Sequence, residues 1–429
     1  MLVEENPSVI YIAILLELNP LYMIRDYLTI DDIDLRGKTV LCRLDLNSPM
    51  DPKGIILDDS RFRSHLITLK ELEDSKVVII SHQSRPGKSD FTTMEPHSRL
   101  LSKLMRCNVD YVDDIFGSHA INSIREMENG GVILLENTRF YSEESFERTP
   151  KEHSRTHMVK RLSPICDVFM NDAFSVSHRS HLSVTGFTEV LPSIAGRVME
   201  KEIDSLNRGL SCSERPCVYV LGGTKVDDSI KVTKNVLERG CADRILVTGV
   251  VANVFLAAKG VKIGGTNMSF IEKQGYLSQI DIARELLSRF GKNIGLPQDV
   301  ALNKNDERVE EKVRNLNTEL PIHDIGIETM VIFSKEIASA KIVIMNGPAG
   351  VFEKEAFALG THELIKAGTK SGFSVIGGGH IAAAAEQLGI SSKFSHVSTG
   401  GGACIDFLAG EKLPGIEALK DAARKFRQQ

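Results

Sequence analysis

The chain has 429 residues, with 52 Lys and Arg against 57 Asp and Glu and a formal net charge of −5. This length predicts two or three domains, and a content of 42% hydrophobic and 25% charged residues is typical of an ordinary globular protein. The near balance of charge excludes a global positive field of the kind that recruits nucleic acid. We therefore expect no nucleic-acid partner, and any cationic chemistry must be local.

The cysteines and the N-terminal residues bear on the compartment. Seven cysteines stand at irregular spacings without a CxxC pair, which fits neither a disulfide framework nor a zinc site and favours a reducing cytoplasm. The apolar stretch 9–16 is too short to span a bilayer, and acidic rather than basic residues precede it, unlike a signal peptide. We expect no membrane partner, and we interpret residues 1–22 as an N-terminal extension or a misassigned start ahead of Met23.

Short runs of strand-forming residues alternate with longer helical patterns along nearly the whole chain. This alternation predicts an α/β fold, with parallel sheets whose strands are joined by crossover helices. Several of the runs are apolar at consecutive positions, which is typical of strands covered on both faces. The strands that we expect lie at residues 39–44, 77–80, 132–135, 168–170, 218–221, 245–247, 342–345 and 374–376.

A predicted helix at residues 195–210 marks the domain boundary. Apolar side chains recur in it at helical spacing, and the polar segment SCSERP follows it. A helix that leads into a polar linker is a natural hinge, although it is also an ordinary α/β connection. We expect a first domain over residues 23–210 that ends in this helix, a second domain over 211–405, and a C-terminal segment over 406–429.

In the first half of the chain, the turns after the predicted strands are cationic. They read RLDLNSP, SHQSRPG, LLENTRF and NDAFSVSHRSH. Ligands of open parallel sheets bind beyond the carboxyl ends of the strands, and a cluster of like charges there is costly without a counter-anion. One such arginine alone is more often a surface charge, but the set predicts a site for a small anion. Its members are Arg43, Arg61, His82, Arg85, Arg139, His178, Arg179 and His181, with Asp45 and Asn47 beside them. A metal at His178 and His181 is disfavoured, because no HExxH pattern accompanies them.

In the second half, the corresponding turns are rich in glycine. They read VLGGTKV, IMNGPAGVFE, VIGGGH and HVSTGGGA. Glycines let backbone amides approach a phosphate at a helix N-terminus, and Lys225 can follow a phosphate as a point charge. The turn GGGHIA also matches a dinucleotide signature, so a nicotinamide-dependent oxidoreductase stays as an alternative, but no acidic residue follows at the distance needed to hold a ribose. No Walker A pattern is present.

Taken together and in this order, the motifs resemble those of phosphoglycerate kinase, and the likeness covers about residues 28–419. RLDLNSP is similar to that family's RVDFNVP, SHQSRPG to SHLGRPxG, LLENTRF to LLENxRF, and NDAFSVSHRSH to NDAFGxxHRxH. LGGTKVDDSI is similar to LGGAKVxDKI, MNGPAGVFE to WNGPxGVFE, and residues 396–419 to the family's C-terminal signature.

The resemblance implies two Rossmann-like domains with parallel sheets, joined by a hinge helix, and a C-terminal segment that returns to the N-terminal domain. It also implies a cytoplasmic glycolytic kinase, a monomer or homodimer, that transfers a phosphoryl group reversibly between 1,3-bisphosphoglycerate and ADP, giving 3-phosphoglycerate and ATP with Mg²⁺. On this basis the cationic set binds the phosphoglycerate. The nucleotide positions implied are Gly222, Gly223, Lys225, Gly249, Asn346, Gly350, Glu353, Gly377, Gly378, Gly379 and His380. Phosphoryl transfer itself needs cations over the equatorial oxygens, and we expect Arg61 and Lys225 to supply them as catalytic groups. The amides of Gly378, Gly379, Gly401 and Gly402 add hydrogen-bond donors where negative charge develops.

The chain departs from the family pattern at several positions. Ser229 replaces a lysine, which leaves open whether Lys231 takes over its charge, and His380 replaces the aspartate of GGGD. Asp228 stays a candidate Mg²⁺ ligand, although the nucleotide's own oxygens are the better ones. The adenine wall and the SHQSRP turn also differ. These departures indicate a divergent, archaeal-type branch, and they leave a second alternative, a metabolite-binding regulator that has lost phosphoryl transfer.

Overall fold

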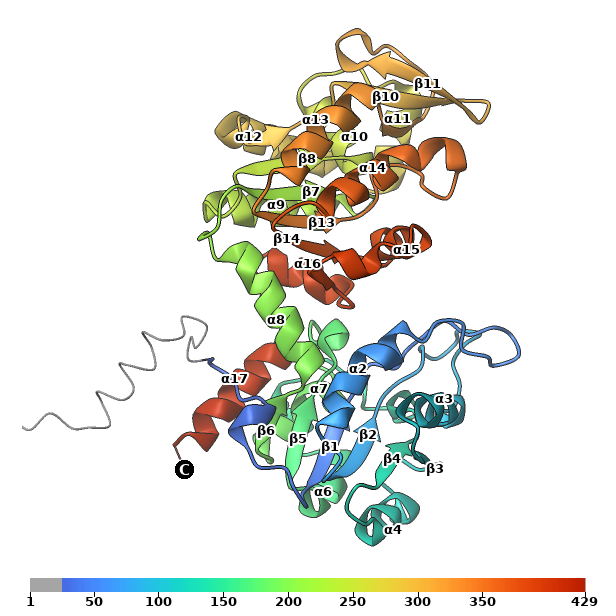
Figure 1. The fold of residues 1–429 in the computed structure, drawn as a ribbon, viewed down its shortest axis with the longest axis vertical. Coiled ribbons are helices and arrows are strands. Elements are labelled where there is room, and N and C mark those ends of the chain that lie inside the picture. Colours follow the sequence, from blue (N-terminus) through green and yellow to red (C-terminus); the bar gives the residue numbers. More distant parts are fainter. Residues whose placement is uncertain (1–24, 429) are drawn as a thin grey trace, which may run out of the picture.

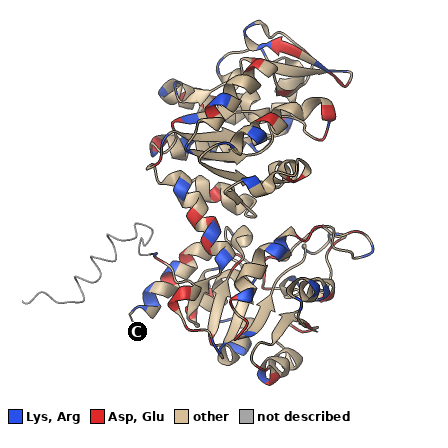
Figure 2. Cartoon of the chain, in the orientation of Figure 1, with Lys and Arg blue, Asp and Glu red and all other residues tan. Residues whose placement is uncertain are grey.

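The computed structural model describes residues 25–428, so the expected N-terminal extension lies outside the described residues. Figure 1 shows two α/β lobes joined by helix α8 (Arg197–Leu210). Each lobe is built on a six-stranded parallel sheet, and together they confirm the predicted fold class. Basic and acidic residues are interspersed over both lobes, as the balanced composition predicts (Figure 2).

The N-terminal lobe contains the sheet with strand order β3-β4-β2-β1-β5-β6. Its strands are β1 (Thr39–Arg43), β2 (Lys76–Ile80), β3 (Asp110–Val112), β4 (Val132–Leu135), β5 (Val168–Asn171) and β6 (Ser193–Ala195). Its helices are α2 (Ser60–Lys70), α3 (Glu95–Met105), α4 (Ser118–Glu126), α5 (Pro150–His153), α6 (His157–Leu162) and α7 (Leu182–Thr185). Alternate residues of β2 enter two different cores, Val77 and Ile79 one and Val78 and Ile80 the other, so the consecutive apolar run reflects a sheet covered on both faces.

The C-terminal lobe contains the sheet with strand order β15-β14-β13-β7-β8-β9. Its strands are β7 (Cys217–Leu221), β8 (Arg244–Val247), β9 (Ile294–Gly295), β13 (Ile342–Asn346), β14 (Phe373–Gly377) and β15 (His396–Val397). Its helices are α9 (Val226–Glu238), α10 (Gly249–Ala258), α11 (Gly265–Lys273), α12 (Leu277–Phe290), α13 (Ile327–Ala338), α14 (Leu359–Gly368), α15 (Gly379–Gln387) and α16 (Gly402–Leu408). All eight expected strands are present, with ends that differ by at most one residue.

A small antiparallel sheet in the C-terminal lobe was not expected. It consists of β10 (Asp299–Lys304), β11 (Glu307–Lys312) and β12 (Ile322–Ile325), in the order β11-β10-β12. The turn between β10 and β11 places Asn305 and Asp306 at φ 53° and 65°, as a tight hairpin turn requires. Strand β11 reads ERVEEK and is largely exposed, so it lacks the apolar run by which the other strands were found.

Two long-range connections complete the fold. The last helix, α17 (Pro414–Phe426), packs on β6 and α7 of the N-terminal lobe (Figure 1). Cys212 and Cys241 form a disulfide, which corrects the expectation that the cysteines form none. Their separation of 29 residues in the sequence did not indicate the disulfide, because it is the return of the chain along α9 that brings the second cysteine back to the end of α8.

No helix among residues 25–428 combines the length and apolar character that crossing a membrane requires.

Candidate functional site

A cavity of about 890 Å³ lies between the two lobes. The carboxyl ends of parallel strands meet at one sheet edge, and the loops after β2, β4 and β5 bring predicted cations together there, beside Asp45 and Asn47 from the loop after β1. Arg61 joins them from the first turn of α2. The C-terminal lobe contributes Lys225 and residues 400–402. From the predicted anion-binding set, the lining residues are Asp45, Asn47, Arg61, His82, Arg85, Arg139, His178, Arg179 and His181.

Arg43 is the member of the predicted set that does not line the cavity. It ends strand β1 and is only 2% exposed. Its Nε donates to Ser183 Oγ at 2.9 Å, and its Nη2 lies 3.0 Å from His82 Nδ1. Burial lowers the pKa of the Arg43 guanidinium to about 10. The structure therefore does not support direct ligand contact for Arg43, which instead contacts the lining residue His82.

The two polar residues after β1 have partners within the protein. The Asp45 carboxylate pairs with the Arg61 guanidinium and accepts a hydrogen bond from Ser175 Oγ. Asn47 Oδ1 accepts from the backbone N–H of Ser84 at 2.7 Å, and Arg139 donates to the carbonyl of Ser84. Asp45 and Asn47 thus orient the arginine and the loop around the cavity in addition to facing it.

The cavity is electrostatically costly without an anion. Burial lowers the pKa of His82 well below its ordinary value, and the guanidiniums of Arg43 and Arg139 lower it further. Burial, followed by the charge of Arg179, lowers the pKa of His181 to about 3 and that of Arg139 to about 10. Burial also lowers the pKa of Arg61. An anionic ligand offsets these costs, because it favours the charged form of every group around it.

The pH dependence of stability tests whether His181 is buried in its neutral form. Its pKa falls from 6.5 to about 3 on folding, so the unfolded chain binds more protons between these values and stability is lost as the pH drops below about 6.5. We expect His181→Asn to reduce the loss of unfolding free energy between pH 7 and pH 5 by about 1 kcal/mol, a value discounted for solvent screening. Urea denaturation at the two pH values measures this difference. Equal losses in the variant and the parent protein would contradict the burial of a neutral His181.

A second cavity, of about 220 Å³, lies in the C-terminal lobe. The turns after β7, β8 and β13 approach one another there so closely that only glycine fits: a Cβ at Gly249 would lie 2.7 Å from the backbone nitrogen of Gly223, and its φ is +58°. Ala252, Pro297 and Val300 contribute apolar walls. The predicted nucleotide positions that line the cavity are Gly223, Gly249, Gly350, Glu353 and His380.

The remaining predicted nucleotide residues lie elsewhere. Gly222, Asn346 and Gly377 are buried at the ends of β7, β13 and β14 and do not line this cavity. Gly378 caps α15, which begins at Gly379, and Lys225 lies in the larger cavity with Gly402. Asn346 Nδ2 is buried without a hydrogen-bond partner.

The candidate metal ligand Asp228 lines neither cavity. Burial raises the pKa of its carboxyl, and repulsion from Asp227 raises it further. Within residues 25–428, no group of three or more His, Cys, Asp or Glu side chains could hold a metal ion. The described part of the chain thus holds no ligand cluster for Mg²⁺, and the structure gives no support to Asp228 as a ligand.

Several lining residues were missed from the sequence. Val300, Ile322 and His323 of the smaller cavity come from the antiparallel sheet, which carried no motif. Asn253, on α10, lines the same cavity with its Oδ1 buried and unpartnered. Ser175 of the larger cavity stands inside NDAFSVSHRSH but was passed over because it is uncharged.

A buried glutamate on α8 holds the glycine turn that faces the cations. Glu202 is fully buried, and its Oε1 accepts from the backbone N–H of Thr399 at 2.7 Å. Its Oε2 lies 2.8 Å from His396 Nε2. The turn then presents Gly402 to the N-terminal lobe, where a Cβ on this residue would lie 3.7 Å from His178 Nε2. Helix α8 thus fixes the position of residues 400–402 at the point where the lobes approach each other.

Comparison with known proteins shows the family of the chain. Residues 30–411 match the family model described as phosphoglycerate kinase. The chain belongs to the phosphoglycerate kinase family. A phosphoglycerate kinase of Methanosarcina mazei is 64% identical over 405 residues, which cover 94% of this chain and 97% of the relative. One of Methanothermus fervidus is 51% identical, with 93% and 98% covered. The crystal structure of phosphoglycerate kinase from Pyrococcus horikoshii OT3 superposes with a TM-score of 0.86 at 43% identity, covering 93% of this chain and 99% of the other.

The departures from the phosphoglycerate kinase pattern can now be placed in the structure. Lys231 pairs with Glu411 at 3.3 Å on the surface and does not line the larger cavity, so it does not replace the lysine missing at Ser229. Ser229 is buried in α9. Gln83 donates from Nε2 to the carbonyl of Ser48 at 3.0 Å, which ties the SHQSRP turn to the loop after β1. The archaeal relatives agree with the divergent branch that these departures predict.

Proposed function

We propose that the chain is a glycolytic kinase that transfers a phosphoryl group reversibly between 1,3-bisphosphoglycerate and ADP, giving 3-phosphoglycerate and ATP. Membership of the phosphoglycerate kinase family supports this activity. The observation that carries the proposal is the cavity between the lobes, which sets the cations of one lobe opposite Lys225 and the glycine turn of the other. This is the arrangement that a donor and an acceptor bound to different lobes require.

The phosphoglycerate belongs to the cationic side of this cavity. It carries a carboxylate and a phosphate, and guanidiniums bind both by bidentate, charge-assisted hydrogen bonds. Arg139 and Arg179 line this cavity and can bind the phosphate, and His82 and His181 can act as neutral donors because their pKa values are lowered. Asp45 can orient the hydroxyl of the acid once Arg61 turns to the substrate.

The nucleotide belongs to the smaller cavity and the turns beside it. Its apolar walls suit a base, and Glu353 at the rim can accept from the ribose hydroxyls. The amides of Gly378 and Gly379 begin a helix of nine residues and can meet the phosphates. The chain of phosphates then leads toward Lys225 in the larger cavity.

Mg²⁺ enters with ADP or ATP in this proposal. The described residues supply no ligand cluster, so the phosphate oxygens of the nucleotide are its main ligands. Bound there, the ion neutralises phosphate charge.

Transfer needs in-line placement and cations over the equatorial oxygens, and little covalent chemistry from the protein. Arg61 supplies one cation from the N-terminal lobe and Lys225 another from the C-terminal lobe. The amides of Gly401 and Gly402 add donors where negative charge develops. No general base is required, because the acceptor oxygen is already ionised. Bringing both ligands together expels water, and α8 is the element about which the lobes close.

The domain division follows from this allocation. Residues 23–210 form the phosphoglycerate-binding domain, ending in α8 as the hinge helix, and residues 211–405 form the nucleotide-binding domain. We expect the C-terminal segment, residues 406–429, to return to the first domain through α17, which packs on β6 and α7. Helix α16, which crosses the boundary between residues 405 and 406, packs on α9 of the C-terminal lobe. We expect a cytoplasmic enzyme, monomeric or homodimeric.

A coupled assay with 3-phosphoglycerate and ATP at varied Mg²⁺ tests the activity. The same assay distinguishes the kinase from a metabolite-binding regulator, which would bind 3-phosphoglycerate without turnover. A fluorescence titration with NADH tests the oxidoreductase alternative, which the family match does not support. Binding of 3-phosphoglycerate with no product formed would overturn the proposed activity.

Replacing Glu353 by Ala tests the place of the nucleotide. We expect the Kd for ADP to rise about tenfold, because the ribose hydroxyls lose a carboxylate acceptor, while the Kd for 3-phosphoglycerate stays unchanged. Calorimetric titration of each ligand measures both constants. Glu355→Ala is the matched control, since this glutamate is exposed nearby and does not line the cavity. A collapse of 3-phosphoglycerate affinity would show that the ligands are assigned to the wrong lobes.

A further inference from the structure

A buried chain of hydrogen bonds connects the floor of the larger cavity to the start of α8. It begins at the backbone N–H of Asp45, which donates to His65 Nε2 at 3.2 Å. His65 Nδ1 lies 2.7 Å from Asp172 Oδ2. His65 is 2% exposed and Asp172 fully buried, and His65 lies one helical turn after Arg61 on α2. The function proposed above does not use His65.

The partners of His65 fix its protonation pattern. Because the amide of Asp45 can only donate, Nε2 must carry a lone pair, and Nδ1 must carry the proton that is donated to the Asp172 carboxylate. Rotating the ring by a half turn would set an N–H against the amide and a lone pair against the carboxylate. The side chain is therefore locked in one orientation by groups from the loops that follow β1 and β5.

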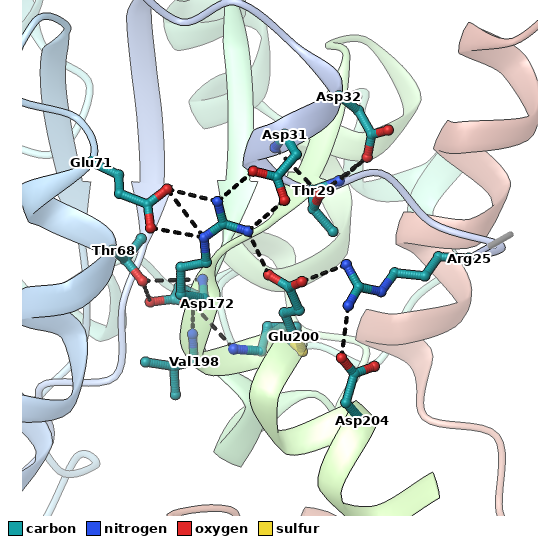
Figure 3. A network of polar contacts seen from close by, with 12 residues as sticks. Arg25, Thr29, Asp31, Asp32, Thr68, Glu71, Asp172, Val198, Glu200 and Asp204 are labelled. Atoms are coloured by element: carbon teal, nitrogen blue, oxygen red, sulfur yellow. Dashed lines mark hydrogen bonds and ion pairs between the residues drawn. The ribbon is translucent and has the colours of Figure 1, made fainter. Parts of the chain in front are cut away.

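Asp172 in turn holds the first turn of α8. Its Oδ1 accepts from the backbone N–H groups of Val198 at 2.8 Å and Met199 at 3.1 Å, and its Oδ2 also accepts from Thr68 Oγ1 at 2.7 Å. Thr68 Oγ1 accepts from the N–H of Arg197 at 3.1 Å. Figure 3 shows Thr68 and Asp172 against the start of the helix. Three N–H groups that have no partner inside the helix are thus capped by the N-terminal lobe.

The outer contacts of the same turn are of a different kind. Arg197 pairs with Asp31 and Glu71 at 2.7 Å each and with Glu200 at 2.8 Å, at the side of the helix that solvent reaches (Figure 3). Partly exposed pairs of this type are screened and anchor the helix without contacting the cavity. Unlike these outer pairs, the buried series of hydrogen bonds runs from the cavity to the helix.

We propose that His65 is a positioning residue that couples occupancy of the phosphoglycerate site to the seating of α8. Arg61 and Asp45 pair in this structure. When Arg61 turns to an anionic ligand, Asp45 and the loop after β1 shift, and the locked imidazole passes this shift to the carboxylate that caps α8. Because Glu202 on the same helix holds residues 396–399, the glycine turn of the other lobe moves with it. This inference rests on the proposed function, which places the phosphoglycerate beside Asp45.

Two half-substitutions separate the links of the chain. In His65→Asn, the side-chain amide takes the place of Nδ1, so the bond to Asp172 is kept and the bond to Asp45 is lost. In His65→Gln, the side-chain amide takes the place of Nε2, so the bond to Asp45 is kept and the bond to Asp172 is lost. We expect each variant to lower kcat about tenfold with KM for both substrates changed less than about twofold, within the range of measured couplings. Saturating 3-phosphoglycerate changes the Kd for ADP by a coupling factor, and this factor should move toward one in both variants. Binding 3-phosphoglycerate and ADP together gives an unreactive complex, and the decrease in the radius of gyration on forming it should be smaller in both variants than in the parent protein.

The matched control is Ser98→Ala. Ser98 is buried on α3 of the N-terminal lobe, donates to the carbonyl of Val109 at 2.6 Å and lines neither cavity. It should lose stability without any change in kcat or in the coupling factor. If the His65 variants behave in the same way, with lowered unfolding midpoints and parental kcat and coupling, His65 is only a structural residue and the proposal is overturned. Calorimetry of 3-phosphoglycerate binding to the parent protein and to Arg139→Ala tests the proposed function separately, because it does not depend on α8.

Discussion

Arg61→Ala is expected to lower kcat about 10³-fold while changing the Kd for ADP less than about twofold. Arg61 reaches the larger cavity from the first turn of α2, and its side chain keeps 31% exposure there. Its partner Asp45 is nearly buried, so truncation removes a cation from the transferred phosphoryl group and leaves a carboxylate facing the anionic substrate. Both effects act most strongly where charge accumulates in the transition state.

Steady-state kinetics in both directions and calorimetry with ADP measure this result. Arg63→Ala is the control, since Arg63 stands on the same helix and pairs with Asp59 at the surface, 2.7 Å away. It should leave kcat unchanged. An equal loss of turnover and of ADP affinity in Arg61→Ala would contradict its assignment to the phosphoryl group and the N-terminal lobe.

Lys225→Met is expected to have the second large effect, a decrease in kcat of about 10²- to 10³-fold. Lys225 is the N-cap residue of α9, two residues after Gly223 in the turn that follows β7, and it lines the cavity together with the arginines. None of the ion pairs among residues 25–428 involves it, so its ammonium is available to follow a phosphoryl group between the lobes. Methionine keeps the length of the side chain and removes the charge.

Lys231→Met is the matched control, because Lys231 stands two turns along the same helix and pairs with Glu411 outside the cavity. Its kcat should equal that of the parent protein. If Lys225→Met instead raised KM for ADP at unchanged kcat, the lysine would bind the ground state only, and Arg61 would be left as the single side-chain cation at the reaction.

The sequence predicted the parallel sheets and most of the larger cavity for one physical reason. Strands buried on both faces have unbroken apolar runs, such as residues 77–80, and the residue that follows each run must lie at the same sheet edge. His82, Arg139 and His178 could therefore be grouped without any structure. Arg43 was misplaced because it is the last residue of a strand that is covered on both faces, so it stays inside the lobe and does not reach the loop beyond the strand.

Features without a local signal were missed. Strand β11 is charged and exposed, and the cysteines at 212 and 241 meet only because α9 returns the chain. Asp228 sits beside a glycine turn in sequence, but the helical periodicity of α9 carries it away from both cavities. His65 was missed for the same reason, because nothing in the segment RFRSHLIT indicates that its imidazole contacts a carboxylate 107 residues further along the chain.

The position of α17 has a consequence for synthesis. Ala423 enters the same core as β1, and Lys425 pairs with Glu189 at 2.6 Å. The N-terminal lobe is therefore closed by residues that leave the ribosome after the whole C-terminal lobe. Until then the nascent first lobe keeps the apolar face that α17 covers exposed, and we expect this face to make the incomplete chain prone to aggregation.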